Sequence, residues 1–236
     1  MTSHVKTHKF LQFFRFLCLI IHFVSGLLQS FIYPHVNRRT QRYMAKKWAQ
    51  RFLRILNIKL HYHGSLPSDD QARVILAANH ISWLDVIAIL AIYPVRFVAK
   101  SEILDWPIIG KLSANAGTIF VAREKRNDTL RVNQFLSEIL IAGDRIAIFP
   151  EGTTSDGTHL LHFHASLLQF AVASKGLVYP VAIHYRDAMN QPTTLTAYVD
   201  VSITQSLQLI LQQPSCHVEL TFLDPLQGEE KNRREL

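Results

Sequence analysis

The first 60 residues of this 236-residue chain contain no aspartate and no glutamate, although they hold eleven lysines and arginines. The remaining 176 residues carry fourteen basic and eighteen acidic side chains, so the whole formal net charge of +7 comes from the N-terminus. Nucleic acid is one partner that such a basic segment attracts. The apolar run beside it argues against nucleic acid and favours an anionic membrane surface as the partner.

Cysteine is almost absent. The two cysteines, Cys18 and Cys216, are too few for a disulfide framework, and we expect both to be buried free thiols in a reducing compartment. No Cys-x-x-Cys pair occurs, which argues against a structural zinc site. Internal repeats and low-complexity linkers are missing too. With 48% hydrophobic residues, the chain is long and apolar enough for one domain with a full core.

Charged residues are also missing from Phe16 to Asn37, an apolar stretch of about the length that crosses a bilayer. No small-x-small cleavage site follows it, which argues against a signal peptide. The next segment, Tyr43–Asn57, has apolar residues at helical spacing and basic residues on the other face, the pattern of a helix lying in the headgroup plane. We therefore predict two helices over residues 9–57, joined near Tyr33, that dock the protein on or into one leaflet.

Two other interpretations of this segment stay open. Both helices could cover the soluble core, or the first could span the bilayer. We expect residues 1–60 to form the membrane-docking segment and residues 61–236 to form the second domain.

Strands and helices alternate in that second domain. Short apolar runs predict strands, and segments with helical periodicity or capping residues predict helices. The predicted strands are 74–78, 96–99, 118–122, 145–149, 178–184, 195–199 and 217–223, and the predicted helices are 83–92, 129–142, 166–173 and 203–212. This alternation predicts an α/β fold, in which helices flank a mostly parallel sheet and ligands gather at the carboxyl ends of the strands.

A histidine and an aspartate, His80 and Asp85, follow the first of these strands. One helical turn separates them, so Asp85 can accept the Nδ1 proton of His80 and leave Nε2 facing a substrate hydroxyl. This is the base and the orienting carboxylate of a Ser-His-Asp triad, with the nucleophile supplied by the substrate. The spacing alone is a weak signal, because chance gives about half a His-x4-Asp match in a chain of this composition.

Three further blocks accompany this pair. They are Gly117–Arg123, Phe149–Ser155 and Val178–Ile183, and each contains or follows a predicted strand. In this order and spacing, the four blocks resemble those of the glycerolipid acyltransferase family, which includes the 1-acylglycerol-3-phosphate acyltransferases. The resemblance runs from about Asn79 to Tyr185, and the first and third blocks carry most of its specificity.

The resemblance implies roles for residues in these blocks. The family associates a lysine and an arginine, at the positions of Lys100 and Arg123, with binding of the acceptor phosphate. It associates the block that contains Glu151, Gly152 and Thr153 with the acceptor pocket. A planar guanidinium suits a phosphate, and a glycine permits close backbone approach to a ligand. The family needs neither a metal nor a cofactor, so we expect none.

One position departs from the family pattern. His164 stands where many members carry a lysine. A neutral imidazole contributes less to phosphate binding than an ammonium group. Members with this substitution resemble acyltransferases that act on lyso-ornithine lipid, whose acceptor has no phosphate. His164 is thus an expected substrate-binding residue that leaves the identity of the acceptor open.

These features predict a membrane-associated O-acyltransferase. It would move a fatty acyl group from an acyl carrier protein or coenzyme A thioester to the hydroxyl of 1-acylglycerol-3-phosphate, giving phosphatidic acid. Lyso-ornithine lipid or another lysophospholipid is the alternative acceptor, and a non-catalytic lipid-binding protein is the alternative class. We expect the protein at the cytoplasmic face of a bacterial inner membrane.

Overall fold

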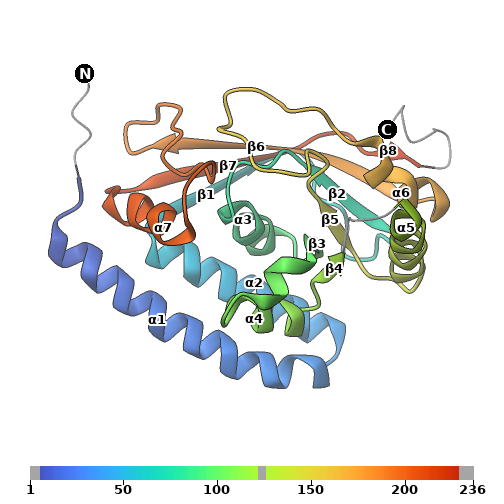
Figure 1. The fold of residues 1–236 in the computed structure, drawn as a ribbon, viewed down its shortest axis with the longest axis horizontal. Coiled ribbons are helices and arrows are strands. Elements are labelled where there is room, and N and C mark those ends of the chain that lie inside the picture. Colours follow the sequence, from blue (N-terminus) through green and yellow to red (C-terminus); the bar gives the residue numbers. More distant parts are fainter. Residues whose placement is uncertain (1–5, 122–125, 229–236) are drawn as a thin grey trace.

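The computed structural model describes residues 6–121 and 126–228, which build a mixed β-sheet with helices on both faces (Figure 1). Its strands are β1 (Ile58–His63), β2 (Val74–Ala78), β3 (Arg96–Lys100), β4 (Ile119–Val121), β5 (Ile146–Ile148), β6 (Leu177–Asp187), β7 (Cys216–Phe222) and β8 (Leu226–Gln227). Across the sheet the order is β1-β7-β6-β2-β5-β3-β4, and β8 pairs with β6. The strands from β2 to β6 run parallel to one another, whereas β7 is antiparallel to β6 and parallel to β1.

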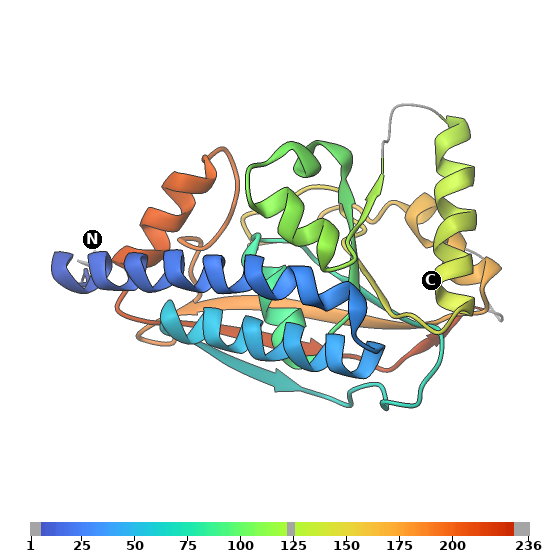
Figure 2. The same cartoon turned by 90° about the horizontal axis from the view of Figure 1, so that it is seen from below.

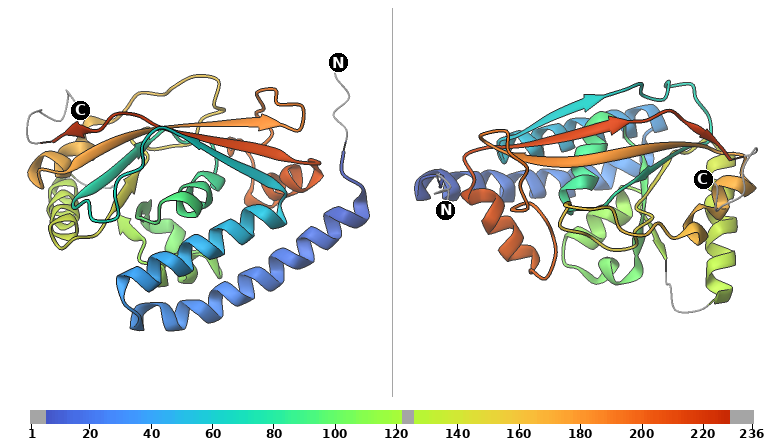
Figure 3. Two further views of the ribbon diagram at one scale, coloured as in Figure 1. Left: turned by 180° about the vertical axis from the view of Figure 1, so that it is seen from behind. Right: turned by 90° about the horizontal axis from the view of Figure 1, so that it is seen from above.

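Helices cover the two faces of this sheet unequally. They are α1 (Lys9–Ile32), α2 (Arg38–Ile55), α3 (Leu84–Ile92), α4 (Ile109–Asn115), α5 (Arg126–Ile141), α6 (Gln169–Ala173) and α7 (Ile203–Gln212), with 3-10 turns at Tyr33–His35, Ser101–Asp105 and Ala165–Leu168. α2 and α3 pack against one face, and α1 lies beside α2 on the outside (Figures 2 and 3). α5 and α6 pack against the other face.

The central strand β2 is apolar along its whole length because both of its faces are buried. Its side chains alternate between the two faces, so Leu76 joins the core beneath α2 and α3 while Ile75 joins the core beneath α5 and α6. All five residues of β2 are buried. Such a run is typical of a parallel strand that is covered on both sides.

The predicted α/β fold is confirmed, and most elements lie within three residues of their predicted ends. The strand predicted at 195–199 is wrong. That segment is held by turn hydrogen bonds, from Ala197 N to Thr194 O and from Leu195 N to Thr193 Oγ1, instead of a strand ladder. Its backbone also reaches the loop after β2 through Tyr198 N and Ile81 O. β1, β8 and α4 were not predicted from the sequence.

The second N-terminal helix, α2, uses its apolar face for the core. Ala49, Phe52 and Leu53 are at most 3% exposed and belong to the core shared with α3. For the apolar face of α2, the interpretation that it covers the core is therefore correct, because the sheet and α3 bury that face. Basic residues such as Arg39 and Lys47 remain exposed on its outer side.

The first helix, α1, is arranged the other way round. The residues that it buries against the protein are mostly polar or small, namely Arg15, Leu19, His22, Gly26 and Ser30. Its outward side is apolar, with exposed side chains at Phe10, Phe13, Phe14, Ile20, Ile21, Val24, Leu28, Phe31 and Ile32. Residues 9–35 are long and apolar enough to cross a membrane by length and composition. The division into residues 1–60 and 61–236 stays a prediction.

Specific contacts fix α1 to the rest of the protein despite this inverted polarity. Arg15 donates hydrogen bonds to the carbonyl oxygens of Gln213, at 2.9 Å, and Pro214, at 3.0 Å. Gly26 lets α1 approach α2 closely, because a Cβ atom at this position would lie 2.5 Å from Trp48 Nε1. These contacts hold α1 in the orientation in which its apolar side faces outward.

Candidate active site

The carboxylate of Asp85 organises the loop between β2 and α3. It is fully buried in the first turn of α3, and its Oδ2 accepts hydrogen bonds from the backbone N–H groups of Ile81, at 2.7 Å, and Ser82, at 2.9 Å. These bonds fold the chain back over the aspartate. The same Oδ2 accepts a hydrogen bond from His80 Nδ1 at 2.8 Å. The carboxylate thus fixes both the loop and the tautomer of the imidazole ring.

A fourth donor reaches this carboxylate from a distant strand. The hydroxyl of Tyr185, on β6, donates to Asp85 Oδ1 at 2.7 Å. Burial raises the pKa of Tyr185 well above its ordinary value, and the charge of Asp85 raises it further, so the hydroxyl keeps its proton. Tyr185 was not predicted from the sequence. The signal that could have found it is an inward-facing tyrosine on a central strand, since a buried tyrosine hydroxyl usually has a partner.

The ring of His80 lies against an aromatic side chain, and both line a cavity. It stacks on Phe149, with ring centroids 3.8 Å apart and an angle of 12° between the planes. The histidine side chain is 20% exposed and lines the cavity. Within residues 6–121 and 126–228, Nε2 makes no hydrogen bond. The nitrogen opposite the carboxylate is therefore available to a ligand.

Glu151, which follows β5, forms a hydrogen bond with the loop that follows β2. Its side chain is 3% exposed; Oε1 accepts from His80 N at 2.8 Å and Oε2 accepts from Leu161 N at 3.2 Å. Both oxygens thus hold backbone in place, which is the role of a turn carboxylate. Gly152, with a φ of +72°, and Thr153 follow it and line the cavity. Contact of this block with an acceptor stays a prediction.

The remaining predicted substrate-binding residues are placed differently. Lys100 is exposed at the carboxyl end of β3 and lines the cavity that contains His80. Arg123 lies outside the described residues. His164 is exposed and does not line the cavity, but its backbone N–H donates to Pro150 O at 2.9 Å, one residue after Phe149. The structure thus brings Lys100 and the Glu151 block to the cavity of His80 and leaves His164 beside it.

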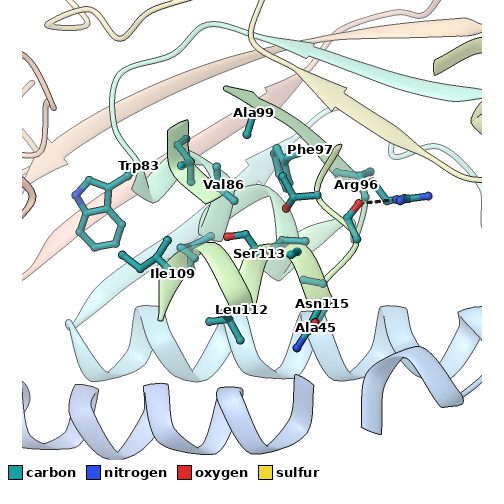
Figure 4. Close-up of a pocket in the computed structure, with 18 of the residues that line it drawn as sticks. Ala45, Trp83, Val86, Arg96, Phe97, Ala99, Ile109, Leu112, Ser113 and Asn115 are labelled. Carbon is teal, nitrogen blue, oxygen red and sulfur yellow. Dashed lines mark hydrogen bonds between the residues drawn. The ribbon is translucent and has the colours of Figure 1, made fainter. Parts of the chain in front are cut away.

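The cavity itself has a volume of about 1060 Å³. It extends between β3, α3 and α4 on one side and the two N-terminal helices on the other (Figure 4). In this view Trp83 lies at one end and Arg96 at the other, with apolar side chains such as Val86, Ile109 and Leu112 between them. A half-buried histidine and a buried carboxylate beside a largely apolar cavity suit a reaction on the head of a lipid chain.

The acyltransferase family profile matches residues 58–184, more than half of the chain. The chain is 39% identical over 150 residues to the 1-acyl-sn-glycerol-3-phosphate acyltransferase of Neisseria gonorrhoeae, covering 64% of this chain and 59% of that protein. It is 33% identical over 195 residues to the lyso-ornithine lipid O-acyltransferase of Pseudomonas aeruginosa, covering 82% of this chain and 73% of that protein. The chain belongs to the acyltransferase family.

A solved structure shares the fold. The crystal structure of the 1-acyl-sn-glycerophosphate acyltransferase PlsC from Thermotoga maritima matches with a TM-score of 0.68 and 21% identity, covering 95% of this chain and 89% of that chain. At this identity, the match shows the fold alone. The chain spans 59% of the length of the Neisseria relatives.

Proposed function

We propose that this protein transfers a fatty acyl group from a thioester to the hydroxyl of a lysolipid at the His80 site. His80 Nε2 would take the hydroxyl proton as the oxygen attacks the thioester carbonyl, and the resulting imidazolium would give a proton to the leaving thiolate. Asp85 would hold the ring and stabilise its positive charge. The observation that carries the proposal is the 2.8 Å hydrogen bond between His80, which lines a largely apolar cavity, and the buried carboxylate of Asp85.

The acceptor that we favour is 1-acylglycerol-3-phosphate, which would give phosphatidic acid. The match to the Neisseria relatives supports this choice. Lys100 supports it too, because an exposed cation beside the cavity is placed to meet a phosphate, and we propose Arg123 as a second cation there. In the same pocket, Glu151, Gly152 and Thr153 would shape the space for the glycerol.

Lyso-ornithine lipid is the second candidate acceptor. Two observations favour it: the relative from Pseudomonas aeruginosa matches a larger share of this chain, and His164 replaces a lysine. A zwitterionic acceptor has no phosphate that needs a further ammonium group at that position.

The outward apolar side of α1 supports docking to a membrane. Large apolar side chains are exposed along most of the length of α1, and exposed cations of α2, such as Arg39 and Lys47, lie on the neighbouring helix. A helix of this polarity buries apolar side chains among acyl chains, while neighbouring cations meet anionic headgroups. Both thioester donors, acyl carrier protein and coenzyme A, belong to the cell interior, so we propose the cytoplasmic face of a bacterial inner membrane.

A panel assay tests the proposed reaction. The purified full chain is offered an acyl thioester together with 1-acylglycerol-3-phosphate, lyso-ornithine lipid or lysophosphatidylcholine, and products are identified by mass. We expect a mass gain of one acyl group on at least one lysolipid, with release of free thiol in equal amount. Thiol release that does not depend on any lysolipid would show a thioesterase, and a lack of turnover with bound lipid would show a lipid-binding protein.

A further inference from the structure

The cavity of His80 ends in a cluster of arginines on its far side. Four of them line the cavity and come from three regions of the chain: Arg38 and Arg42 at the start of α2, Arg96 at the start of β3, and Arg145 just before β5. We call this cluster the arginine end. It lies where the turn between α1 and α2 meets the amino-terminal edge of the sheet.

The arginine end is remote from the proposed catalytic base. Arg96 pairs in register with Ile146 of β5, which pairs with Ile75 of β2. β2 runs three residues beyond Ile75 to Ala78, which is about 10 Å of strand at about 3.3 Å per residue, and His80 follows two residues later in the loop. Lys100 lies four residues after Arg96, at the catalytic level. A phosphate beside a hydroxyl at His80 would lie at the level of Lys100, so the arginine end is separate from the proposed acceptor site.

Carboxylates neutralise only part of the charge there. Asp144 is shared by two arginines, with Oδ2 3.1 Å from Arg96 Nη1 and Oδ1 3.7 Å from Arg38 Nη1. Arg145 pairs with Asp69 at 3.3 Å. Four guanidinium groups therefore face two carboxylates in the described part of the chain.

Arg42 is the arginine with the weakest compensation. Its side chain donates to Gly143 O over a long 3.4 Å contact, and within the described residues it forms no ion pair with a carboxylate. Burial lowers its pKa, and the neighbouring Arg145 lowers it further. A partly buried cation beside other cations gains from an anionic partner, because the low local dielectric strengthens their attraction.

We propose that the arginine end binds the phosphate headgroup of a membrane lipid whose acyl chain lies in the apolar part of the cavity. Arginine forks match phosphate oxygens in geometry as well as charge. The apolar wall between the two ends, which includes Val86, Ile109 and Leu112, suits a hydrocarbon chain. Such a lipid would occupy the same space as a substrate chain, so its binding would lower turnover.

Membrane docking by α1, which is part of the proposed function, would supply this lipid. The arginine end lies beside the turn at which α1 gives way to α2, so a headgroup there remains next to the apolar outer side of α1. A free phosphate ion shares the headgroup chemistry but gains nothing from the apolar wall. A lipid phosphate is therefore the occupant that uses both parts of the cavity.

Titration calorimetry of the full chain in neutral detergent tests the proposal with three probes: decyl phosphate, decanol and inorganic phosphate. We expect decyl phosphate to bind the wild-type protein at least tenfold more tightly than either of the others. Arg42→Gln should weaken decyl phosphate binding by roughly ten- to a hundredfold, the worth of one charge-assisted contact. Decanol binding should change less than twofold, because decanol has no charge.

Matched variants separate this site from the acceptor site. Arg39→Gln removes a neighbouring charge from α2 at an exposed position that does not line the cavity, and it should bind like the wild type. Lys100→Ala should also keep decyl phosphate binding at the arginine end. If Arg42→Gln fails to fold, Arg38→Gln and Arg42→Lys are measured in its place, with thermal unfolding as the check.

Three outcomes would overturn the proposal. Inorganic phosphate that binds as tightly as decyl phosphate would show a site for a free ion. Binding that is unchanged in folded Arg42→Gln and Arg38→Gln proteins would show that the arginines only clamp α2 to the end of α5. Binding that is lost in Lys100→Ala instead would place the phosphate at the catalytic end. Since calorimetry needs no turnover, binding that depends on Arg42 would stand even if acyl transfer were not observed.

Discussion

The hydroxyl of Tyr185 donates a 2.7 Å hydrogen bond to Oδ1 of Asp85, the carboxylate oxygen that His80 leaves unused. The two residues lie 100 positions apart in the chain and meet because β6 neighbours β2 in the sheet. With this bond, both oxygens of the carboxylate have donors from the protein. Tyr185 is thus a positioning residue: it acts on the proposed base through Asp85.

We expect Tyr185→Phe to impair turnover without removing a reacting group. The change leaves Oδ1 of Asp85 buried without a donor, which costs about 1–3 kcal/mol. A carboxylate with one donor fewer attracts the imidazolium of His80 more strongly. The acid limb of kcat/KM should then shift to higher pH, and kcat near neutral pH should fall roughly tenfold.

The matched control is Tyr179→Phe, which removes a hydroxyl from the same strand and the same face but makes no contact with Asp85. Its pH profile should match that of the wild type. A purely structural role for Tyr185 would lower the unfolding free energy while leaving the acid limb of the profile in place, and that result would contradict the prediction.

The second prediction concerns His80 and Asp85, the proposed catalytic pair. His80→Ala should lower kcat by roughly 10²–10⁴, the usual contribution of a general base, while circular dichroism remains unchanged. Asp85→Asn should also lose much of the rate, because an amide can hold the ring in the wrong tautomer. Its effect on stability should be larger, since Asp85 also binds the N–H groups of Ile81 and Ser82. Near-normal turnover in folded His80→Ala would rule out the mechanism.

Local pattern was enough to predict the alternating strands and the His80–Asp85 pair. The apolar run of β2 is continuous because both faces of the strand are buried, and the pair lies within one turn of chain. Tyr185 was missed because its partner depends on the register of β6 beside β2, which no local spacing reveals. The segment 195–199 has strand-like composition, but turn hydrogen bonds and one bond to the loop after β2, from Tyr198 N to Ile81 O, hold it instead.

The N-terminal helices show a different limit of sequence reasoning. The sequence pattern predicted two helices and a basic segment. It also predicted that the apolar faces of both helices contact the membrane. In the structure, the sheet and α3 occupy the apolar face of α2, and α1 buries its polar and small residues instead. Which side of an amphipathic helix meets the protein depends on what the neighbouring elements offer, such as the carbonyl groups that receive Arg15.

This arrangement makes a third prediction, about membrane docking. Phe13 and Ile21 are 59% and 69% exposed on the outer side of α1. The double variant Phe13→Glu/Ile21→Glu should lower the affinity of the protein for anionic vesicles at least tenfold. The reason is that each apolar side chain buried in the membrane contributes about 1.5–3 kcal/mol to binding. Sedimentation with vesicles measures this. Leu160→Glu changes a similarly exposed apolar residue in the loop after β5, away from α1, and should bind like the wild type.

The fourth prediction concerns the charge of the acceptor. Lys100→Ala should raise the acceptor KM roughly tenfold if the acceptor carries a phosphate, because one charge-assisted contact is lost, and it should leave the thioester KM nearly unchanged. Arg123→Ala should act in the same direction. Lys59→Ala is the control, since this exposed lysine lies on β1 and does not line the cavity. Equal increases in both KM values would show a general distortion of the site.

The fifth prediction concerns His164, which lies beside the site and breaks the family pattern. Its backbone N–H donates to Pro150 O, and Pro150 follows Phe149, whose ring stacks on His80. His164→Lys places an ammonium group, a full positive charge, at this position. We expect the ratio of turnover with 1-acylglycerol-3-phosphate to turnover with lyso-ornithine lipid to increase severalfold, because the ammonium group attracts a phosphomonoester and gains nothing from a zwitterion. Competition between the two lysolipids in one reaction, with products separated by mass, measures the ratio directly.

His162→Lys, two residues away and also exposed, controls for added surface charge. A ratio that stays constant in His164→Lys would show that this side chain does not reach the acceptor and that its departure from the family pattern carries no information about the substrate.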